Sequence, residues 1–154
     1  FFYFSHLSAK RLVKLERIKY NADIIQYISI FESLTNSKVK DCIANEPNDS
    51  MLFIMQENEM GKAIGKNGFN IKRAESIFKK SIRLVEFSNN LAKFVQNIIY
   101  PVRAKEIREE NGTVNIYCED AKSKGRIIGR DRHNLNSING IVKRHFDIAE
   151  VKVV

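Results

Sequence analysis

The residues that most clearly suggest chemistry form a short glycine loop, Gly65-Lys66-Asn67-Gly68. Glycine adopts backbone conformations with positive φ and allows a phosphodiester to approach the main chain closely. Consecutive backbone N–H groups can bind an anionic oxygen, and a helix that begins after the loop adds a positive dipole end. The loop therefore suits a phosphate backbone, although an isolated G-x-x-G is usually a simple turn between two helices.

The same pattern recurs 64 residues later, which makes a simple turn a poor explanation. Four residues are identical at this offset, and four more pairs are conservative, all within an eleven-residue window without a gap. The identical pairs are Gly61/Gly125, Ile64/Ile128, Gly65/Gly129 and Asn70/Asn134; the conservative ones are Lys62/Arg126, Lys66/Arg130, Asn67/Asp131 and Ile71/Leu135. We infer that the chain contains two copies of one structural unit.

Elements that can position the first loop follow from hydrophobic periodicity. Residues 24–34 carry a helical apolar stripe, 38–45 and 51–55 resemble strands, and 46–49 form a turn. Residues 59–64 predict a short helix before the loop, and a second helix follows it with Ile71, Ala74, Ile77 and Phe78 facing inward. With a strand over 81–87, the predicted order is α-β-β-α-α-β.

The second copy predicts the same order. Residues 91–99 form a helix, and 102–109 and 113–119 form a hairpin across Asn111-Gly112, a strong turn signal. A short helix over 121–128 ends at the second loop, Gly129-Arg130-Asp131-Arg132. The helix after it has Leu135, Ile138, Ile141 and Val142 facing inward, and 146–153 is the last strand.

Positive charge is concentrated around both loops. Residues 60–83 and 121–145 each hold seven Lys or Arg residues and one acidic residue, so together they carry +12. The whole chain carries +8, which leaves −4 for the remainder. Two basic surfaces on an otherwise acidic chain point to a polyanionic partner.

The combination of a glycine loop between two short helices, a basic helix after it and the α-β-β-α-α-β order resembles the KH domain family in its type II arrangement. The resemblance implies an α+β fold of two tandem KH domains, each a three-stranded mixed sheet packed against helices. We expect an N-terminal extension without ordered structure over residues 1–20, a first KH domain over 21–88 and a second over 89–154. Two type II KH domains with no flexible linker resemble the NusA transcription factor family in its short archaeal form. This resemblance implies a role in transcription elongation, termination or antitermination.

In KH domains the loop clamps about four nucleotides of single-stranded backbone, and the bases lie in a groove between helices and sheet edge. The resemblance therefore implies RNA-binding residues at both loops. In the first copy they are Lys62, Ile64, Gly65, Lys66, Asn67, Gly68, Phe69, Ile71, Lys72 and Arg73. In the second they are Arg126, Ile128, Gly129, Arg130, Asp131, Arg132 and His133.

The second loop departs from the family pattern because Arg132 stands where the pattern has its closing glycine. A side chain there obstructs close backbone approach, so we expect the second loop to bind more weakly. From the length of the chain we also expect no counterpart of the polymerase-binding N-terminal domain or the OB-fold domain of bacterial NusA proteins. RNA polymerase and other transcription factors are therefore open as partners beside single-stranded RNA.

The sequence gives little support for nucleotide hydrolysis, metal binding or other catalytic chemistry. Gly61-x-x-x-Gly65-Lys66-Asn67 is one residue too short for a nucleotide P-loop, and Asn67 stands where Ser or Thr must reach magnesium. Cys42 and Cys118 lack metal-ligand spacing and are interpreted as small apolar strand residues. We therefore expect no enzyme activity, catalytic residue, metal, cofactor or membrane contact, and a cytoplasmic location. Two alternatives remain open: an RNA-binding role in ribosome assembly or translation, and a protein-interaction scaffold whose loops no longer bind RNA.

Overall fold

The computed structural model describes residues 22–45 and 50–154. The extension predicted over residues 1–20 and the turn predicted over 46–49 lie outside the described residues. The described chain forms two compact units, of which one ends at Asn89 and the other begins at Asn90.

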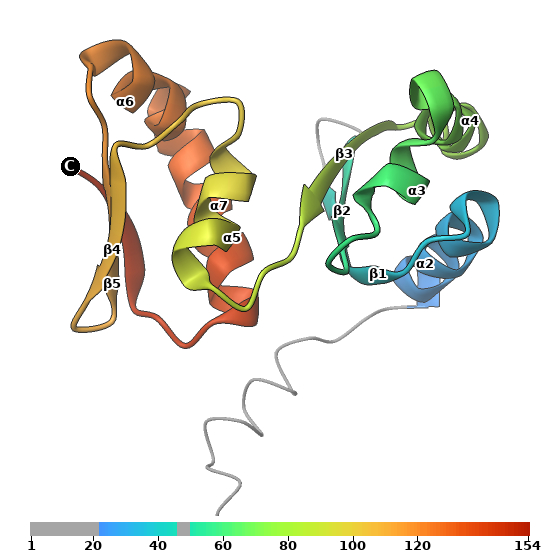
Figure 1. Ribbon diagram of the computed structural model, residues 1–154, viewed down its shortest axis with the longest axis horizontal. Coiled ribbons are helices and arrows are strands. Elements are labelled where there is room, and N and C mark those ends of the chain that lie inside the picture. Colours follow the sequence, from blue (N-terminus) through green and yellow to red (C-terminus); the bar gives the residue numbers. More distant parts are fainter. Residues whose placement is uncertain (1–21, 46–49) are drawn as a thin grey trace, which may run out of the picture. The chain divides into compact units, whose positions relative to one another are not determined.

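In the first unit, helix α2 (Ala22–Thr35) is followed by strands β1 (Val39–Asn45) and β2 (Ser50–Met55). Helix α3 (Met60–Ile64), the single turn η1 (Lys66–Gly68) and helix α4 (Phe69–Phe78) precede strand β3 (Ser81–Glu86). The sheet has the order β1-β2-β3; β1 runs antiparallel and β3 parallel to β2. Helix α2 packs on β1, and α3 and α4 pack on β3 (Figure 1).

The second unit repeats this arrangement. Helix α5 (Leu91–Ile99) precedes strands β4 (Glu106–Glu110) and β5 (Thr113–Tyr117), then helix α6 (Ala121–Ile128), turn η2 (Arg130–Arg132), helix α7 (His133–His145) and strand β6 (Glu150–Val153). Its sheet, β4-β5-β6, again joins an antiparallel and a parallel pair. The predicted α+β class, element order and mixed sheets are confirmed in both units.

Aromatic rings fill the core of the first unit. Phe31 of α2 stacks on Phe53 of β2 with ring centroids 4.2 Å apart, and Phe78 of α4 extends the stack. Ala63 and Ala74, on either side of the loop, are fully buried against this cluster. Burial of these two small side chains fixes both ends of the glycine loop on the core.

Several sequence predictions were wrong in detail. Ile77, predicted to face inward, is 51% exposed. A bulge between Val39 and Asp41 interrupts the simple alternation expected for a strand over 38–45, so Val39 and Cys42, three residues apart, both face the core. Strand β4 begins at Glu106 instead of residue 102, because the Gln96 side chain supplies the hydrogen bonds that a neighbouring strand would supply.

That glutamine donates to the carbonyl of Val102 at 2.9 Å and accepts from the N–H of Ala104 at 3.0 Å. Strand β6 likewise begins at Glu150 rather than 146, since the N–H of Phe146 still bonds to Val142 of α7. Strand β5 ends at Tyr117, which leaves Cys118 just outside it, contrary to its interpretation as a strand residue.

Candidate nucleic-acid interface

The first glycine loop is a tight connection between α3 and α4 in which three residues have unusual backbone conformations. Gly65 has φ 73° and ψ 173°, a region that side chains rarely adopt, and Asn67 and Gly68 are left-handed with φ 56° and 74°. The N–H of Gly65 closes α3 on the carbonyl of Gly61 at 2.9 Å. Helix α4 then starts directly from the loop, so that its N-terminal end lies at the exposed Lys66 and Asn67.

An asparagine holds each loop in place. The Asn70 side chain donates to the carbonyl of Lys62 at 2.8 Å and so ties the start of α4 to α3. It fills the space beside Gly65, where an added Cβ would lie 2.7 Å from its Cγ. Recurrence of this asparagine as Asn134 was visible in the sequence, but its supporting role was not predicted.

The second loop has the same backbone despite its different sequence. Gly129 has φ 73° and ψ 173°, and Asp131 has φ 53°. Asn134 donates to the carbonyl of Arg126 at 3.0 Å and lies 2.6 Å from the position of a Cβ on Gly129. The two loops are therefore structural equivalents.

Arg132 occupies the closing position with φ 60° and ψ 19°, close to the 74° and 16° of Gly68. A Cβ added to Gly68 would meet no atom nearer than 3.8 Å. An arginine thus fits this position without changing the backbone and costs only the strain of a left-handed residue. Its predicted effect on RNA affinity remains a prediction.

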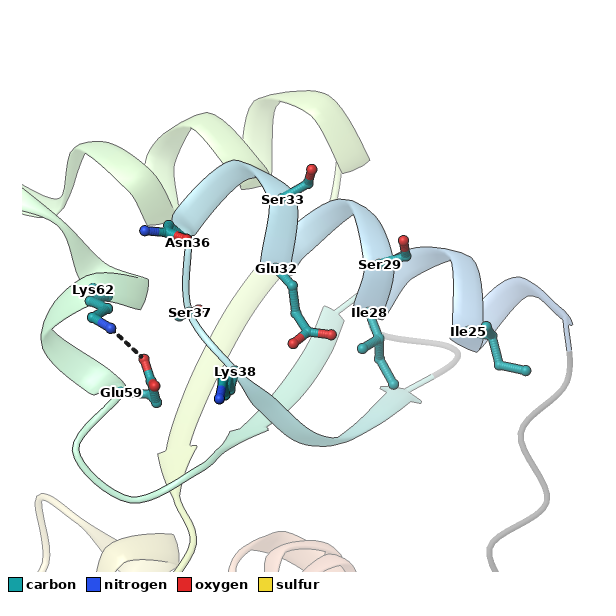
Figure 2. A pocket seen from close by; sticks show the side chains of 10 residues that line it. All are labelled: Ile25, Ile28, Ser29, Glu32, Ser33, Asn36, Ser37, Lys38, Glu59 and Lys62. Atoms are coloured by element: carbon teal, nitrogen blue, oxygen red, sulfur yellow. Dashed lines mark ion pairs between the residues drawn. The ribbon is translucent and has the colours of Figure 1, made fainter.

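The predicted basic residues are not equally available. Lys66, Lys72 and Arg73 have exposed side chains, as do Arg126, Arg130 and Arg132 in the second unit. Lys62 forms an ion pair with Glu59, with Nζ and Oε2 3.5 Å apart. Figure 2 shows the pair at one end of a pocket of about 600 Å³ between α2, the segment after it and α3. Lys62 is exposed as well, with 59% of its side chain accessible, and differs from the other cations in having this ion pair.

Apolar groups accompany the first loop. Phe69 is 64% exposed at the loop exit, and Ile64 is 39% exposed at the end of α3. Ile71 is partly buried on the core. An exposed ring beside a phosphate site can stack on a base. At the corresponding position of the second loop, His133 is also exposed.

A groove of about 470 Å³ lies beside the second loop, between the helices and the last strand. Ile128, Arg132 and Leu135 line its helical side; Glu150, Lys152 and Val153 of β6 line the other. The sequence did not predict these three strand residues as part of the site, because it carries no signal for which side of an edge strand a pair of helices leaves open.

Asn139 of α7 decides which part of the outer edge of β6 is accessible. Its side chain accepts from the N–H of Val151 at 2.7 Å and donates to the carbonyl of that residue at 3.1 Å. The N–H of Val154 bonds inward to Ile116 of β5 at 2.8 Å. Because backbone groups alternate between the two sides of a parallel strand, those of Val153 point outward beside the groove.

Residues 22–45 and 50–154 contain no group of three His, Cys, Asp or Glu side chains that could hold a metal ion. No helix in this part of the chain is long and apolar enough to cross a bilayer. Partial burial raises the pKa of the Cys118 thiol, which opposes thiolate formation there.

Comparison with known proteins gives consistent matches. A family model described as KH domain matches residues 25–106. The "Probable transcription termination protein NusA" of Methanocaldococcus jannaschii is 30% identical over 91% of this chain and 77% of its own length. The protein of the same name from Methanococcus vannielii is 31% identical over 90% of this chain and 80% of its own length. The one from Halobacterium salinarum is 30% identical over 88% of this chain and 98% of its own length.

Among solved structures, the crystal structure of a protein designated APE1850 matches with a TM-score of 0.73 and 30% identity. The match covers 88% of this chain and all of the other.

Proposed function

Because the chain belongs to the KH domain family, and within it to the NusA-like proteins, we propose that it is a single-stranded RNA-binding transcription factor. It acts in elongation, termination or antitermination and catalyses no reaction. The observation that carries this proposal is the duplicated loop, which has one backbone conformation in both units and exposed cations beside it. RNA polymerase and other transcription factors are proposed protein partners, and the cytoplasm is the proposed location.

Each unit is proposed to bind one stretch of RNA, with 21–88 and 89–154 as the bounds of the two modules. The backbones of Gly65 and Gly68 approach the phosphates, and Lys66 and Asn67 clamp them. In the second unit, Gly129 and Arg130 to Arg132 take these positions. Lys62, Lys72, Arg73 and Arg126 add positive charge, and Lys62 also pairs with Glu59.

The apolar residues at the loop are proposed to receive the bases. Ile64 and Ile71 line the base groove of the first unit, and Ile128 lines that of the second. Phe69 stacks on a base, and His133 contacts the RNA at the equivalent point. These assignments are supported by the exposure of Phe69 and Ile64, two large apolar side chains next to a basic loop.

Measurement of RNA affinity at several salt concentrations tests the first part of the proposal. A KH loop clamps about four nucleotides. Each contact to a single-strand phosphate contributes about 0.7 to the slope of log affinity against log salt. We expect a slope of about −3 for one loop and a steeper one for both. A duplex of equal length that competes as well as the single strand would contradict the proposal.

Crosslinking of RNA to the protein in cells, followed by sequencing, tests the second part. Nascent transcripts should dominate the bound RNA. Enrichment of ribosomal RNA instead would refute the role in transcription while leaving the RNA-binding activity intact.

A further inference from the structure

The groove of the second unit has charged groups of both signs around an apolar floor. Ile128, Leu135 and Val153 supply the apolar surface, and Arg132 lies on the side of the loop. Glu150 and Lys152 stand two residues apart on β6, and therefore on one face of the strand, with Oε1 and Nζ 3.6 Å apart. The volume of about 470 Å³ falls within the range usual for small-ligand sites.

We propose, on the premise that the chain binds single-stranded RNA, that this groove is a cytosine-selective subsite with Glu150 as its specificity-determining residue. The carboxylate of Glu150 accepts a hydrogen bond from the exocyclic amino group of cytosine. Lys152 and Arg132 donate to the ring nitrogen and the carbonyl oxygen. The apolar floor covers the face of the base.

The donor and acceptor pattern of the bases selects cytosine. The charged side chains of the groove offer one anionic acceptor and two cationic donors, and the pairing edge of cytosine offers the complement, one amino donor and two acceptors. Uracil has carbonyl oxygens at both ends of that edge, so one of them would face the Glu150 carboxylate. Guanine has two donors and one acceptor there, which is the reverse of what the groove requires. Adenine leaves one of the two cations without an acceptor.

Glu150 has the capacity for this additional contact. A carboxylate can accept about four hydrogen bonds, and the ion pair with Lys152 is the contact that the structure gives this side chain. Both side chains are about half exposed, with side-chain accessibilities of 58% for Lys152 and 49% for Glu150, so a base can reach them from solvent.

The first unit lacks the same set of groups. Gly68 stands at the loop position of Arg132. In the last strands the offset of 64 no longer applies, because α7 is longer than α4. The equivalent hydrogen bonds from the N–H of Phe87 to Met55 and from the N–H of Val154 to Ile116 align Glu150 with Arg83 and Lys152 with Val85. None of these residues is acidic and Val85 is buried, so the first unit lacks the carboxylate acceptor. Selectivity for cytosine is therefore a property of the second unit, while the first unit binds RNA with less regard to the base.

A titration of the full chain followed by ¹⁵N NMR tests the proposal, because it reports on each unit separately. The probes are short oligouridines, either unmodified or with one cytidine or one guanosine. The amide signals of Ile128, Leu135 and Val153 should give an affinity about tenfold higher for the RNA that contains cytidine. Glu150→Gln should reduce this ratio to about one, because the neutral amide is a weaker acceptor for the amino group of cytosine and can instead donate to a carbonyl oxygen of uracil.

The matched control is Glu109→Gln, which removes the same charge from β4 of the same unit and should leave the cytidine preference unchanged. Equal affinity of the parent protein for all three RNAs, a preference for guanosine, or retention of the cytidine preference in Glu150→Gln would each overturn the proposal. So would RNA-induced shifts confined to the loops, with none in the groove. Absence of any shift with any RNA would instead refute the RNA-binding function itself.

Discussion

The replacement of single glycines in the first loop tests how the loop is held in place. Gly65 and Gly68 both have positive φ, but their surroundings differ. A Cβ on Gly65 would overlap Asn70, at 2.7 Å from its Cγ, whereas a Cβ on Gly68 would meet nothing nearer than 3.8 Å. We therefore expect Gly65→Ala to destabilise the first unit much more than Gly68→Ala.

The magnitudes follow from the backbone angles and from one hydrogen bond. The conformation of Gly65, φ 73° and ψ 173°, belongs to a region that is almost restricted to glycine, and a side chain there costs about 1–3 kcal/mol. Displacement of Asn70 also breaks its hydrogen bond to Lys62, a loss of about 1 kcal/mol. The expected cost of Gly65→Ala is about 2–4 kcal/mol. Gly68→Ala costs only the left-handed strain, about 1 kcal/mol.

Urea unfolding followed by circular dichroism measures these costs, since the chain contains no tryptophan for a fluorescence signal. Gly129→Ala is the matched variant in the second unit, where the distance to Asn134 is 2.6 Å, and it should behave like Gly65→Ala. Gly65→Ala combined with Asn70→Ala should cost less than the sum of the two single changes, because the overlap with Cγ is gone. Equal costs for Gly65→Ala and Gly68→Ala would refute the assignment of Asn70 as the group that holds the loop.

Three further predictions concern the loops and a helix cap. Replacing Lys66 and Asn67 by Asp should reduce RNA affinity, measured by fluorescence anisotropy, more than Arg130→Asp does. The free energy of unfolding should change by only about 0.5 kcal/mol, as for other surface substitutions. A greater loss of affinity from Arg130→Asp would contradict the steric argument about Arg132. Arg132→Gly should stabilise the second unit by about 0.5 kcal/mol in urea unfolding. The relief of strain from the left-handed backbone conformation exceeds the cost of the extra entropy that glycine gives the unfolded chain. Destabilisation would show that the arginine contributes contacts to the fold. The N–H of Ser123 donates a hydrogen bond to the Asp120 carboxylate at 2.6 Å and lowers the pKa of that carboxyl group. This cap therefore stabilises the fold above the unfolded pKa of about 3.9, and the stabilisation is lost as the pH falls through the lower folded pKa. The thermal unfolding temperature of Asp120→Ala should differ from that of the parent at neutral pH and converge with it in acid.

The sequence alone determined the repeated unit and the place of the loop. An offset of 64 that preserves glycine, isoleucine and asparagine requires the same local backbone twice, and Gly65 and Gly129 indeed share φ 73°. Helix and strand order followed from apolar periodicity, because each element buries one face or stripe on the core. These features depend on residues close together in the chain, and the sequence shows such relations directly.

Tertiary structure decided what lies around the loop. Arg132 and Gly68 share one backbone conformation because the course of the loop sets it. A Cβ on Gly68 would meet no atom nearer than 3.8 Å, so this position accepts a side chain, which the residue type alone does not show. Gln96 replaces strand pairing at Val102 and Ala104, and Asn139 closes part of β6, through contacts between residues distant enough that no local pattern indicates them. Glu150 and Lys152 reach the groove of the second loop only because β6 is the edge strand beside α6 and α7; the position of a strand in a sheet is set by long-range pairing, which leaves no periodic signal in the sequence.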